Sequence, residues 1–292
     1  MINSNSSKEQ LIHSKKYFID PLASELAEKV TWKYLDGFSN SKSDLYPIAV
    51  IGQGKPLLLL HGFDSCFLEF RRLVPLLKDN NQLIIPDLYG FGFCPRPQNY
   101  DYGIEHILLH LRKVLDIYSI NSGIGVIGAS MGGAIAMELA RRNPEKINRL
   151  LLLSPAGLCS RPTKIFWPFN QLGVWFLKQP CVRKSLCRQA FANPNESVGK
   201  AEEQIASIHL NVPGWQRSLA SFARNGGVAN GECPIPSQPI DVLWGAEDRI
   251  LNSSERKKSM LLLKQDLIEI PECGHLPHLD KPKIVAENCK NF

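Results

Sequence analysis

The segment 124–140 constrains the fold of this chain more than any other stretch. An apolar run leads into Gly-Ala-Ser-Met-Gly at 128–132, and a helix-compatible run follows at once. This order predicts a strand, a sharp turn and a helix. A serine at such a turn is forced toward positive φ, so Gly128 and Gly132 give the backbone the room that it needs. We expect the turn to expose Ser130 at the carboxyl edge of a sheet, beside a helix N-terminus that favours negative charge.

Apolar runs and helix-compatible segments alternate through most of the chain. Between residues 45 and 155 the alternation is regular, and it resumes after residue 239. Runs such as 56–60 are uniformly apolar, which is typical of a strand buried on both faces. The pattern predicts an α/β fold, with a mostly parallel sheet covered by helices on both faces.

The same pattern divides the chain into three parts. Residues 1–40 predict a polar tail and then an amphipathic helix, because apolar residues recur every three or four positions between 19 and 30. Residues 41–155 and 240–292 form the predicted core. Prolines and an aromatic run interrupt the alternation at 156–239, so we interpret this segment as a helical lid inserted between two core strands.

Composition narrows the classes of partner. The net charge of +6 is spread along 292 residues, which argues against nucleic acid but would not oppose an anionic membrane surface. Eight cysteines without a C-x-x-C pair indicate free thiols in a reducing compartment. No apolar window is long enough to span a membrane or serve as a secretory signal. We expect a cytoplasmic protein, or one attached peripherally to an intracellular membrane; its oligomeric state stays open.

Three polar residues follow predicted strands at one edge of the sheet: Ser130, Asp248 and His275. A serine hydroxyl is a weak nucleophile, so it needs a histidine base, and the base needs a carboxylate to orient it. The chain order Ser, Asp, His therefore predicts a catalytic triad. Glu247 and His278 are the alternative acid and base.

The loop His61-Gly62-Phe63-Asp64-Ser65 follows the apolar run 56–60. A loop at this place predicts an oxyanion hole formed by the backbone N–H groups of Phe63 and Met131. We expect His61, Asp64 and Ala129 to shape the substrate site beside it.

The aromatic run of the lid includes Trp167 and Trp175. One interpretation is that these rings pack the lid onto the core. The alternative is that they bind a lipophilic substrate or contact a membrane.

His106 and His110 have the spacing of a metal-binding pair, but no third ligand accompanies them. We therefore expect neither a metal nor another cofactor.

The motifs HGFD, GASMGG, WGAEDRI and CGHLPH resemble those of the α/β-hydrolase superfamily, over about residues 45 to 290. More narrowly, the segments 61–71 and 273–278, with the Lys-Pro at 281–282, resemble the chlorophyll dephytylase group of photosynthetic organisms. Those enzymes cleave the phytyl ester of chlorophyll-type pigments, although Ala129 differs from the residue associated with that group.

The triad and the resemblance together predict a serine hydrolase that cleaves a carboxylic ester of a small lipophilic substrate through an acyl-enzyme. Two alternatives use the same triad: a C–C bond hydrolase and a thioesterase. A third is a ligand sensor on the same fold without productive turnover. Haloalkane dehalogenases and epoxide hydrolases use a carboxylate nucleophile where this chain has Ser130, which sets them aside.

Overall fold

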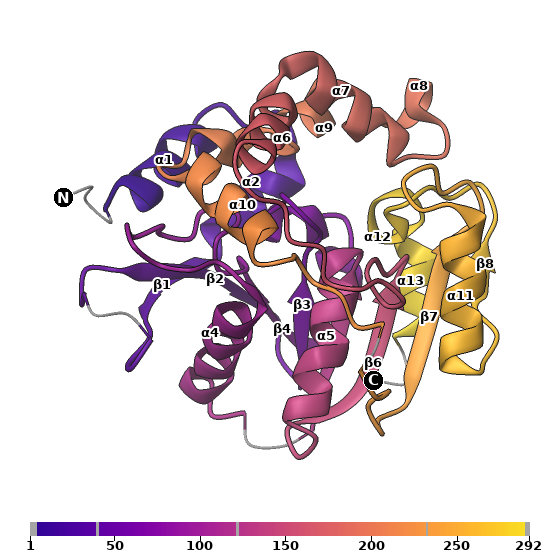
Figure 1. Ribbon diagram of the computed structural model, residues 1–292. Coiled ribbons are helices and arrows are strands. Elements are labelled where there is room, and N and C mark those ends of the chain that lie inside the picture. Colours follow the sequence, from indigo (N-terminus) through magenta and orange to yellow (C-terminus); the bar gives the residue numbers. More distant parts are fainter. Residues whose placement is uncertain (1–4, 39–40, 121–122, 232, 290–292) are drawn as a thin grey trace.

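The computed structural model describes residues 5–38, 41–120, 123–231 and 233–289 (Figure 1). Its strands are β1 Val30–Tyr34, β2 Leu45–Ile51, β3 Lys55–Leu60, β4 Asn81–Pro86, β5 Ile124–Ala129, β6 Ile147–Leu153, β7 Ile240–Gly245 and β8 Ile268–Ile270. In this part of the chain they form one sheet in the order β1-β2-β4-β3-β5-β6-β7-β8.

The sheet is mostly parallel. β2 runs antiparallel to both of its neighbours, β1 and β4. The five remaining pairings, from β4-β3 to β7-β8, are parallel. The predicted α/β-hydrolase fold is thus confirmed, and the carboxyl ends of β3, β5, β6, β7 and β8 lie at the same edge.

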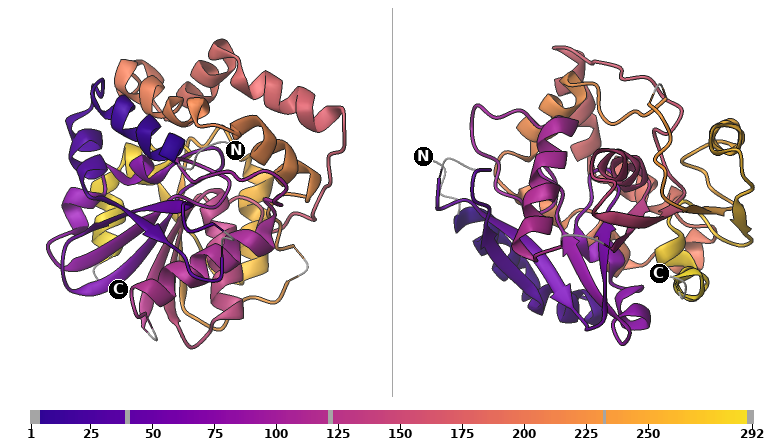
Figure 2. Two further views of the ribbon diagram at one scale, coloured as in Figure 1. Left: turned by 90° about the vertical axis from the view of Figure 1, so that its left-hand side faces the viewer. Right: turned by 90° about the horizontal axis from the view of Figure 1, so that it is seen from below.

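Helices cover both faces of this sheet (Figures 1 and 2). Their bounds are α1 Asn5–Lys15, α2 Pro21–Glu28, α3 Val74–Leu77, α4 Ile104–Ile117, α5 Met131–Arg142, α6 Phe169–Lys178, α7 Pro180–Gln189, α8 Pro194–Ser197, α9 Lys200–Ile205, α10 Trp215–Arg224, α11 Ser253–Leu263, α12 Pro277–Asp280 and α13 Pro282–Asn288, with 3₁₀ turns η1 Phe67–Phe70 and η2 Ile208–Asn211.

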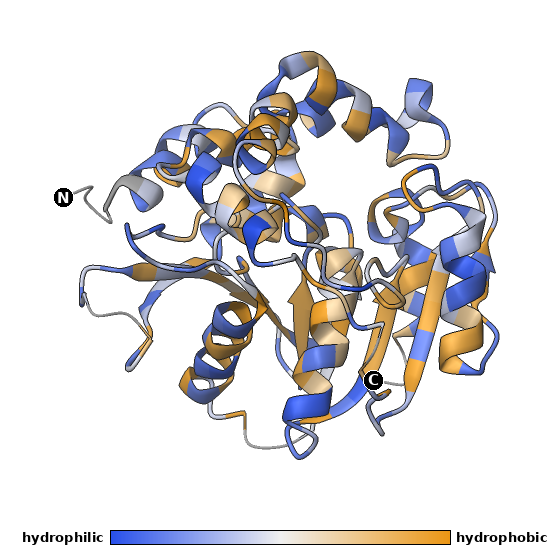
Figure 3. Cartoon of the chain, viewed as in Figure 1, coloured by the Kyte–Doolittle hydropathy of each residue, from blue (hydrophilic) through white to orange (hydrophobic). Residues whose placement is uncertain are grey.

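The uniformly apolar strands are explained by two cores, one on each face. In β3, Leu58 and Leu60 pack with α4 and α5, whereas Leu57 and Leu59 pack with α3 and α13. Successive side chains of a strand point to opposite faces, so every position must be apolar when both faces are covered. Figure 3 shows the consequence, a central sheet coloured as hydrophobic within more polar helices.

The N-terminal part differs from its predicted form. A helix, α1, occupies most of the expected polar tail, and its Leu11 is buried in a core cluster that also contains Ala23, Leu26 and Ala27 of α2. The amphipathic helix α2 forms, with Asp20 accepting a hydrogen bond from the Leu22 amide at 2.9 Å. It ends at Glu28, before Val30, because Val30 pairs with Ala49 as the first residue of β1. Tertiary pairing with β2 thus replaces the last turn of the predicted helix.

Residues 156–239, here called the lid segment, contain α6 to α10 and η2. They leave the sheet after β6 and return to the adjacent strand β7, and α6, α7 and α9 lie above the carboxyl edge of the sheet (Figure 1). No helix of the described residues is long and apolar enough to cross a membrane.

His110 lies on the buried face of α4, among aromatic rings rather than polar ligands. Its ring centroid is 5.4 Å from that of Phe38 and 5.3 Å from that of Tyr46. Neither ring nitrogen has a hydrogen-bond partner among the described residues. Burial lowers the pKa of His110 from 6.5 to about 3. The described residues contain no group of three potential metal ligands around it or elsewhere.

A His110→Phe variant tests this environment through the pH dependence of stability. Above pH 6.5 the imidazole is neutral in both the folded and the unfolded chain. Between pH 6.5 and about 3 only the unfolded chain binds the proton, so the free energy of unfolding of the wild type falls as the pH falls. Urea denaturation should therefore show the variant gaining stability relative to wild type on acidification through this window. A constant difference between the two proteins would contradict the assignment.

Candidate active site

The turn between β5 and α5 holds Ser130 in a strained backbone conformation, with φ of 50° and ψ of −118°. Its amide donates to the Leu153 carbonyl of β6 at 2.9 Å. A Cβ on Gly128 would lie 2.4 Å from the Gly132 carbonyl oxygen, and a Cβ on Gly132 would lie 2.1 Å from the Leu60 carbonyl oxygen. Both glycines are therefore required by close backbone approach, and the positive φ falls on the serine between them.

Ser130, His275 and Asp248 form one hydrogen-bonded chain. The Ser130 Oγ lies 2.9 Å from Nε2 of His275, and Nδ1 of the same ring lies 2.9 Å from Oδ2 of Asp248. Because the carboxylate can only accept, Nδ1 carries the hydrogen and Nε2 is free to accept from the serine hydroxyl. This is the geometry that a histidine needs in order to act as the base for a serine nucleophile.

Asp248 is held as a carboxylate by its surroundings. Its burial acts to raise the pKa, but the His275 ring and the amides of Ile250 and Leu251 outweigh burial and lower the pKa. Both amides donate to Oδ1 at 2.9 Å. One oxygen is thus fixed by the backbone, and the other is left for the histidine.

The alternative acid and base have other partners. Glu247 accepts a hydrogen bond from the Cys273 amide at 2.8 Å and so anchors the loop that carries His275. His278 is fully buried, with its Nε2 3.1 Å from Glu69. Neither side chain is within the hydrogen-bonded chain of Ser130.

The loop after β3 places a free amide near the nucleophile. No described residue accepts a hydrogen bond from the backbone N–H of Phe63 or of Met131. Gly62, just before Phe63, comes close enough to Ser130 that a Cβ on it would lie 3.4 Å from the serine Cβ. The arrangement leaves two donors beside the hydroxyl for a developing negative charge.

His61 orients the peptide that carries the Phe63 amide. Its Nε2 accepts from the Leu88 amide at 3.0 Å, so the hydrogen is on Nδ1, which donates to the Gly62 carbonyl at 2.8 Å. Since N–H and C=O of a trans peptide point in opposite directions, holding the Gly62 carbonyl also aims the Phe63 N–H. Burial lowers the pKa of His61 from 6.5 to about 4, which keeps this tautomer neutral.

A cavity of about 230 Å³ opens beside Ser130, under the lid segment. It is lined by Gly62, Phe63, Asp64, Ser65, Glu69, Ser130, Leu177, Arg183, Leu186, Cys187, Ala190, Ala206, Ile250, His275 and Leu276. Of the residues predicted to bind substrate, the structure places only Asp64 in this wall.

The other predicted substrate residues lie elsewhere. His61 and Ala129 are fully buried behind the loop and at the end of β5. Trp167 and Trp175 are 78% and 60% exposed, so they lie on the outer surface of the lid segment. Leu177 of α6 lines the cavity instead, because the inward face of that helix carries Val174 and Leu177 rather than Trp175.

Two charged cavity residues were not predicted from the sequence. Glu69 lies on η1 and accepts from the Gly62 amide at 3.2 and 3.3 Å. Its burial acts to raise the pKa, but the nearby His278 outweighs burial and lowers the pKa to about 2. Arg183 comes from α7 and pairs with Asp64 at 2.5 Å. No local spacing connects either residue to Ser130, so only the folded chain brings them there.

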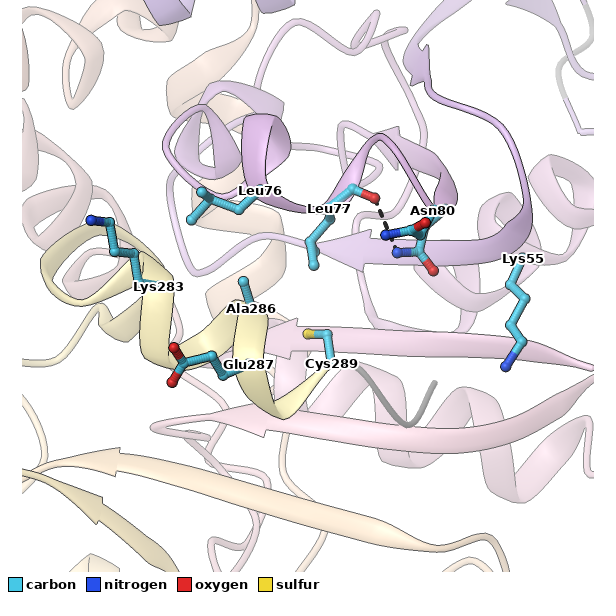
Figure 4. Close-up of a pocket in the computed structure, with 9 residues that line it drawn as sticks. Lys55, Leu76, Leu77, Asn80, Lys283, Ala286, Glu287 and Cys289 are labelled. Carbon is cyan, nitrogen blue, oxygen red and sulfur yellow. Dashed lines mark hydrogen bonds between the residues drawn. The ribbon is translucent and has the colours of Figure 1, made fainter.

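A second cavity, of about 470 Å³, lies far from this chemistry (Figure 4). It opens between α3 and α13 beside Lys55 and Asn81, where β3 and β4 begin. That is the amino edge of those strands, opposite to Ser130. Its volume is larger, but the hydrogen-bonded triad side chains identify the smaller cavity as the candidate active site.

Comparison with known proteins agrees with the fold. Residues 57–288 match the model of the Alpha/beta hydrolase family, and the chain belongs to that family. It is 33% identical over 243 residues to the 2-hydroxy-6-oxo-2,4-heptadienoate hydrolase of Pseudomonas putida, covering 79% of this chain and 86% of the relative. It is 27% identical over 251 residues to Lipase 1 of Psychrobacter immobilis, covering 82% and 77%.

A solved structure of the epoxide hydrolase CorEH superposes on the chain with a TM-score of 0.73. The match covers 90% of this chain and 97% of the other at 19% identity, which establishes the shared fold alone.

Gly132→Ala should damage the turn that holds Ser130, because the new methyl group meets the backbone of β3 rather than a side chain that can move. We expect a loss of about 1 to 3 kcal/mol in the free energy of unfolding, measured by chemical denaturation. Gly173→Ala is the matched control, since a Cβ there meets no atom within 4 Å and lies in a helix. Equal stability of the two variants would contradict the close packing.

Proposed function

We propose that this protein is a serine hydrolase that cleaves a carboxylic ester of a lipophilic substrate. The proposal rests on the hydrogen-bonded side chains of Ser130, His275 and Asp248, in which both hydrogen bonds are 2.9 Å long. The free amides of Phe63 and Met131 lie beside them. Nucleophile, base, orienting acid and oxyanion donors thus come together at one edge of the sheet.

The geometry supports a two-step reaction. The Ser130 Oγ attacks the ester carbonyl carbon while its proton passes to Nε2 of His275, and the carbonyl oxygen becomes an anion held by the two amides. The proton then passes to the departing alcohol as the ester bond breaks. Water attacks the acyl-enzyme in the same way, with His275 as base, and releases the acid.

The charges in the cavity wall favour a neutral substrate. Its charged side chains are Asp64, Glu69 and Arg183, apart from the histidine. Arg183 is paired with Asp64 at 2.5 Å, so the described wall offers a substrate carboxylate no unpaired cation. A dienoate such as that in the name of the Pseudomonas putida relative carries such a carboxylate. An uncharged ester is therefore the better fit, and C–C bond hydrolysis is the second candidate, favoured by the 33% identity to that relative.

The outer surface of the lid segment supports a lipophilic substrate. We define the apolar lid surface as the exposed large apolar side chains between residues 165 and 176: Ile165, Phe166, Trp167, Phe169, Leu172, Trp175 and Phe176. Residues 156–195 include no Asp or Glu, and four of their six Lys or Arg side chains are exposed: Arg161, Lys164, Lys178 and Lys184. Exposed aromatic and basic side chains together match an anionic bilayer, in which esters such as the phytyl ester of chlorophyll dissolve. We therefore propose peripheral membrane contact through this surface.

The reaction is tested with purified protein, a Ser130→Ala control and a panel of substrates. The panel contains chlorophyll a, a long-chain ester, p-nitrophenyl esters, a thioester and 2-hydroxy-6-oxo-2,4-heptadienoate. We expect ester hydrolysis that the substitution lowers by about 10,000-fold or more, without a change in thermal unfolding. Release of phytol from chlorophyll would support the narrower assignment.

Other outcomes separate the alternatives. Faster turnover of the dienoate or the thioester than of every ester would replace ester hydrolysis by C–C bond or thioester hydrolysis. Tight ligand binding without turnover of any substrate would favour a sensor. Ester hydrolysis retained by Ser130→Ala would overturn the mechanism.

Membrane contact is tested by replacing Trp167 and Trp175 together with serine. Loss of two exposed rings should lower sedimentation with vesicles of phosphatidylcholine and phosphatidylglycerol, while hydrolysis of short soluble esters continues, because neither ring lines the cavity. Leu261→Ser is the control, since Leu261 is as exposed as Trp167, at 78%, but lies on α11. Equal vesicle binding by all three proteins would refute the contact.

A further inference from the structure

Asp64 is the point at which the lid segment is attached to the loop beside the nucleophile. Its carboxylate accepts hydrogen bonds from His209 Nε2 at 3.0 Å, from Trp215 Nε1 at 2.8 Å and from Arg183 Nη1 at 2.5 Å. These donors come from three separate elements of the lid segment, η2, α10 and α7. A fourth contact ties the cluster together, because Arg183 also donates to the Ala206 carbonyl.

The cluster is buried and charged. Asp64 is 6% exposed, His209 is fully buried and Trp215 is 2% exposed. The burial of Asp64 acts to raise its pKa, but His209, Arg183 and Trp215 outweigh burial and hold the pKa well below its usual range. Hydrogen bonds to a buried carboxylate are stronger than those between neutral groups, and losing one leaves a costly unpaired partner.

The attachment bears on catalysis because Asp64 is part of the loop that carries the proposed oxyanion donor, Phe63. Asp64 follows Phe63 directly and has a φ of 49°, a left-handed conformation that is less favourable for a residue with a side chain than for glycine. The contacts of its carboxylate with the lid segment stabilise it there. On the other side, Gly62 is held by core residues, its amide by Glu69 and its carbonyl by His61. Phe63 therefore lies between a neighbour fixed by the core and a neighbour fixed by the lid segment.

Helix α10 contacts this loop a second time. The Phe63 ring lies 5.9 Å from that of Phe222, which is on the same helix as Trp215. A displacement of α10 would thus act on both the side chain of Phe63 and the backbone that follows it.

We propose that Asp64 is a positioning residue that makes the oxyanion donor of Phe63 depend on the seated lid segment. With Arg183, His209 and Trp215 in place, the loop holds the Phe63 amide toward the substrate carbonyl. With the lid segment displaced, Asp64 loses the contacts that maintain its backbone conformation, and the Gly62–Phe63 peptide is then held only from the core side, by His61 and Glu69, so the amide is positioned less tightly. The inference rests on the proposed function, since it concerns the same reaction at Ser130.

A single-donor variant and a matched control separate positioning from simple stabilisation. Trp215→Phe removes the indole N–H donated to Asp64 and keeps an aromatic ring. Ser218→Ala removes two other buried hydrogen bonds of α10: the one that Ser218 Oγ accepts from Arg96 Nε and the one that it donates to the Trp215 carbonyl, both at 3.0 Å. Neither involves Asp64. Both variants lose buried hydrogen bonds of the same helix, so the control should shift thermal unfolding by at least as much as Trp215→Phe.

The readout that needs no natural substrate is the reaction of Ser130 with diethyl 4-nitrophenyl phosphate. The serine oxygen bonds to phosphorus, its proton passes to His275, and 4-nitrophenolate leaves and is measured by absorbance. The phosphoryl oxygen occupies the place of the oxyanion, so the rate reports the position of the two amides. Removing an oxyanion donor costs about 100- to 1000-fold in rate; we expect Trp215→Phe, which displaces one, to lower the rate and the kcat for ester hydrolysis by about tenfold or more.

KM should change by no more than about twofold in Trp215→Phe, because the donor acts on the transition state more than on the bound ester. Ser218→Ala should keep both KM and kcat for ester hydrolysis within about twofold of the wild-type values. Asp64→Asn, which removes the charge and keeps the shape, should lower the rate of reaction with diethyl 4-nitrophenyl phosphate further. If Asp64→Asn does not fold, the result for Trp215→Phe decides the test.

The outcomes distinguish this inference from the function on which it rests. Wild-type protein that does not react, or reacts as fast as Ser130→Ala, overturns the proposed function and this inference with it. Wild-type protein that reacts, with Trp215→Phe and Ser218→Ala equally slow or equally unaffected, overturns the inference alone. An effect of Trp215→Phe on KM without one on kcat also overturns it.

Discussion

The approach of the first turn of α5 to the backbone of β3 is the contact on which the site depends. Gly132 lies so close to the Leu60 carbonyl that no side chain fits between them. This contact brings the helix N-terminus against the end of β3, from which the next loop starts. The nucleophile turn and the loop with the Phe63 amide are consequently neighbours, and both follow from the parallel pairing of β3 with β5.

Charges near this turn are balanced in pairs rather than left to solvent. Asp248 is satisfied by two amides and His275, Glu69 by the Gly62 amide and nearby His278, and Asp64 by donors of the lid segment. A buried carboxylate without such partners would take up a proton or destabilise the fold. The same pairing leaves the described cavity wall without a free cation, which is why its electrostatics suit an uncharged substrate.

Some features were accessible to the sequence because they depend on local rules. The tight turn at Ser130 needs glycine on both sides, and strands covered on both faces need uninterrupted apolar runs. Other features could not be predicted from the sequence. The start of β1 at Val30 depends on pairing with β2, and among the described side chains of α1 Leu11 is the one buried apolar residue. Aromatic composition likewise did not reveal that Trp167 and Trp175 face outward.

The sequence by itself determined the fold class and the chain order of Ser130, Asp248 and His275. Apolar strands and the polar residues that follow them can be recognised from neighbouring residues in the sequence. Only the tertiary structure decided which partners these residues meet. Glu69, Arg183 and Trp215 reach the loop of Phe63 from three different elements, and no spacing in the chain records that convergence. The contacts of Ser130 with His275, and of Asp64 with Arg183 and Trp215, join residues more than a hundred positions apart, and no local pattern encodes such packing.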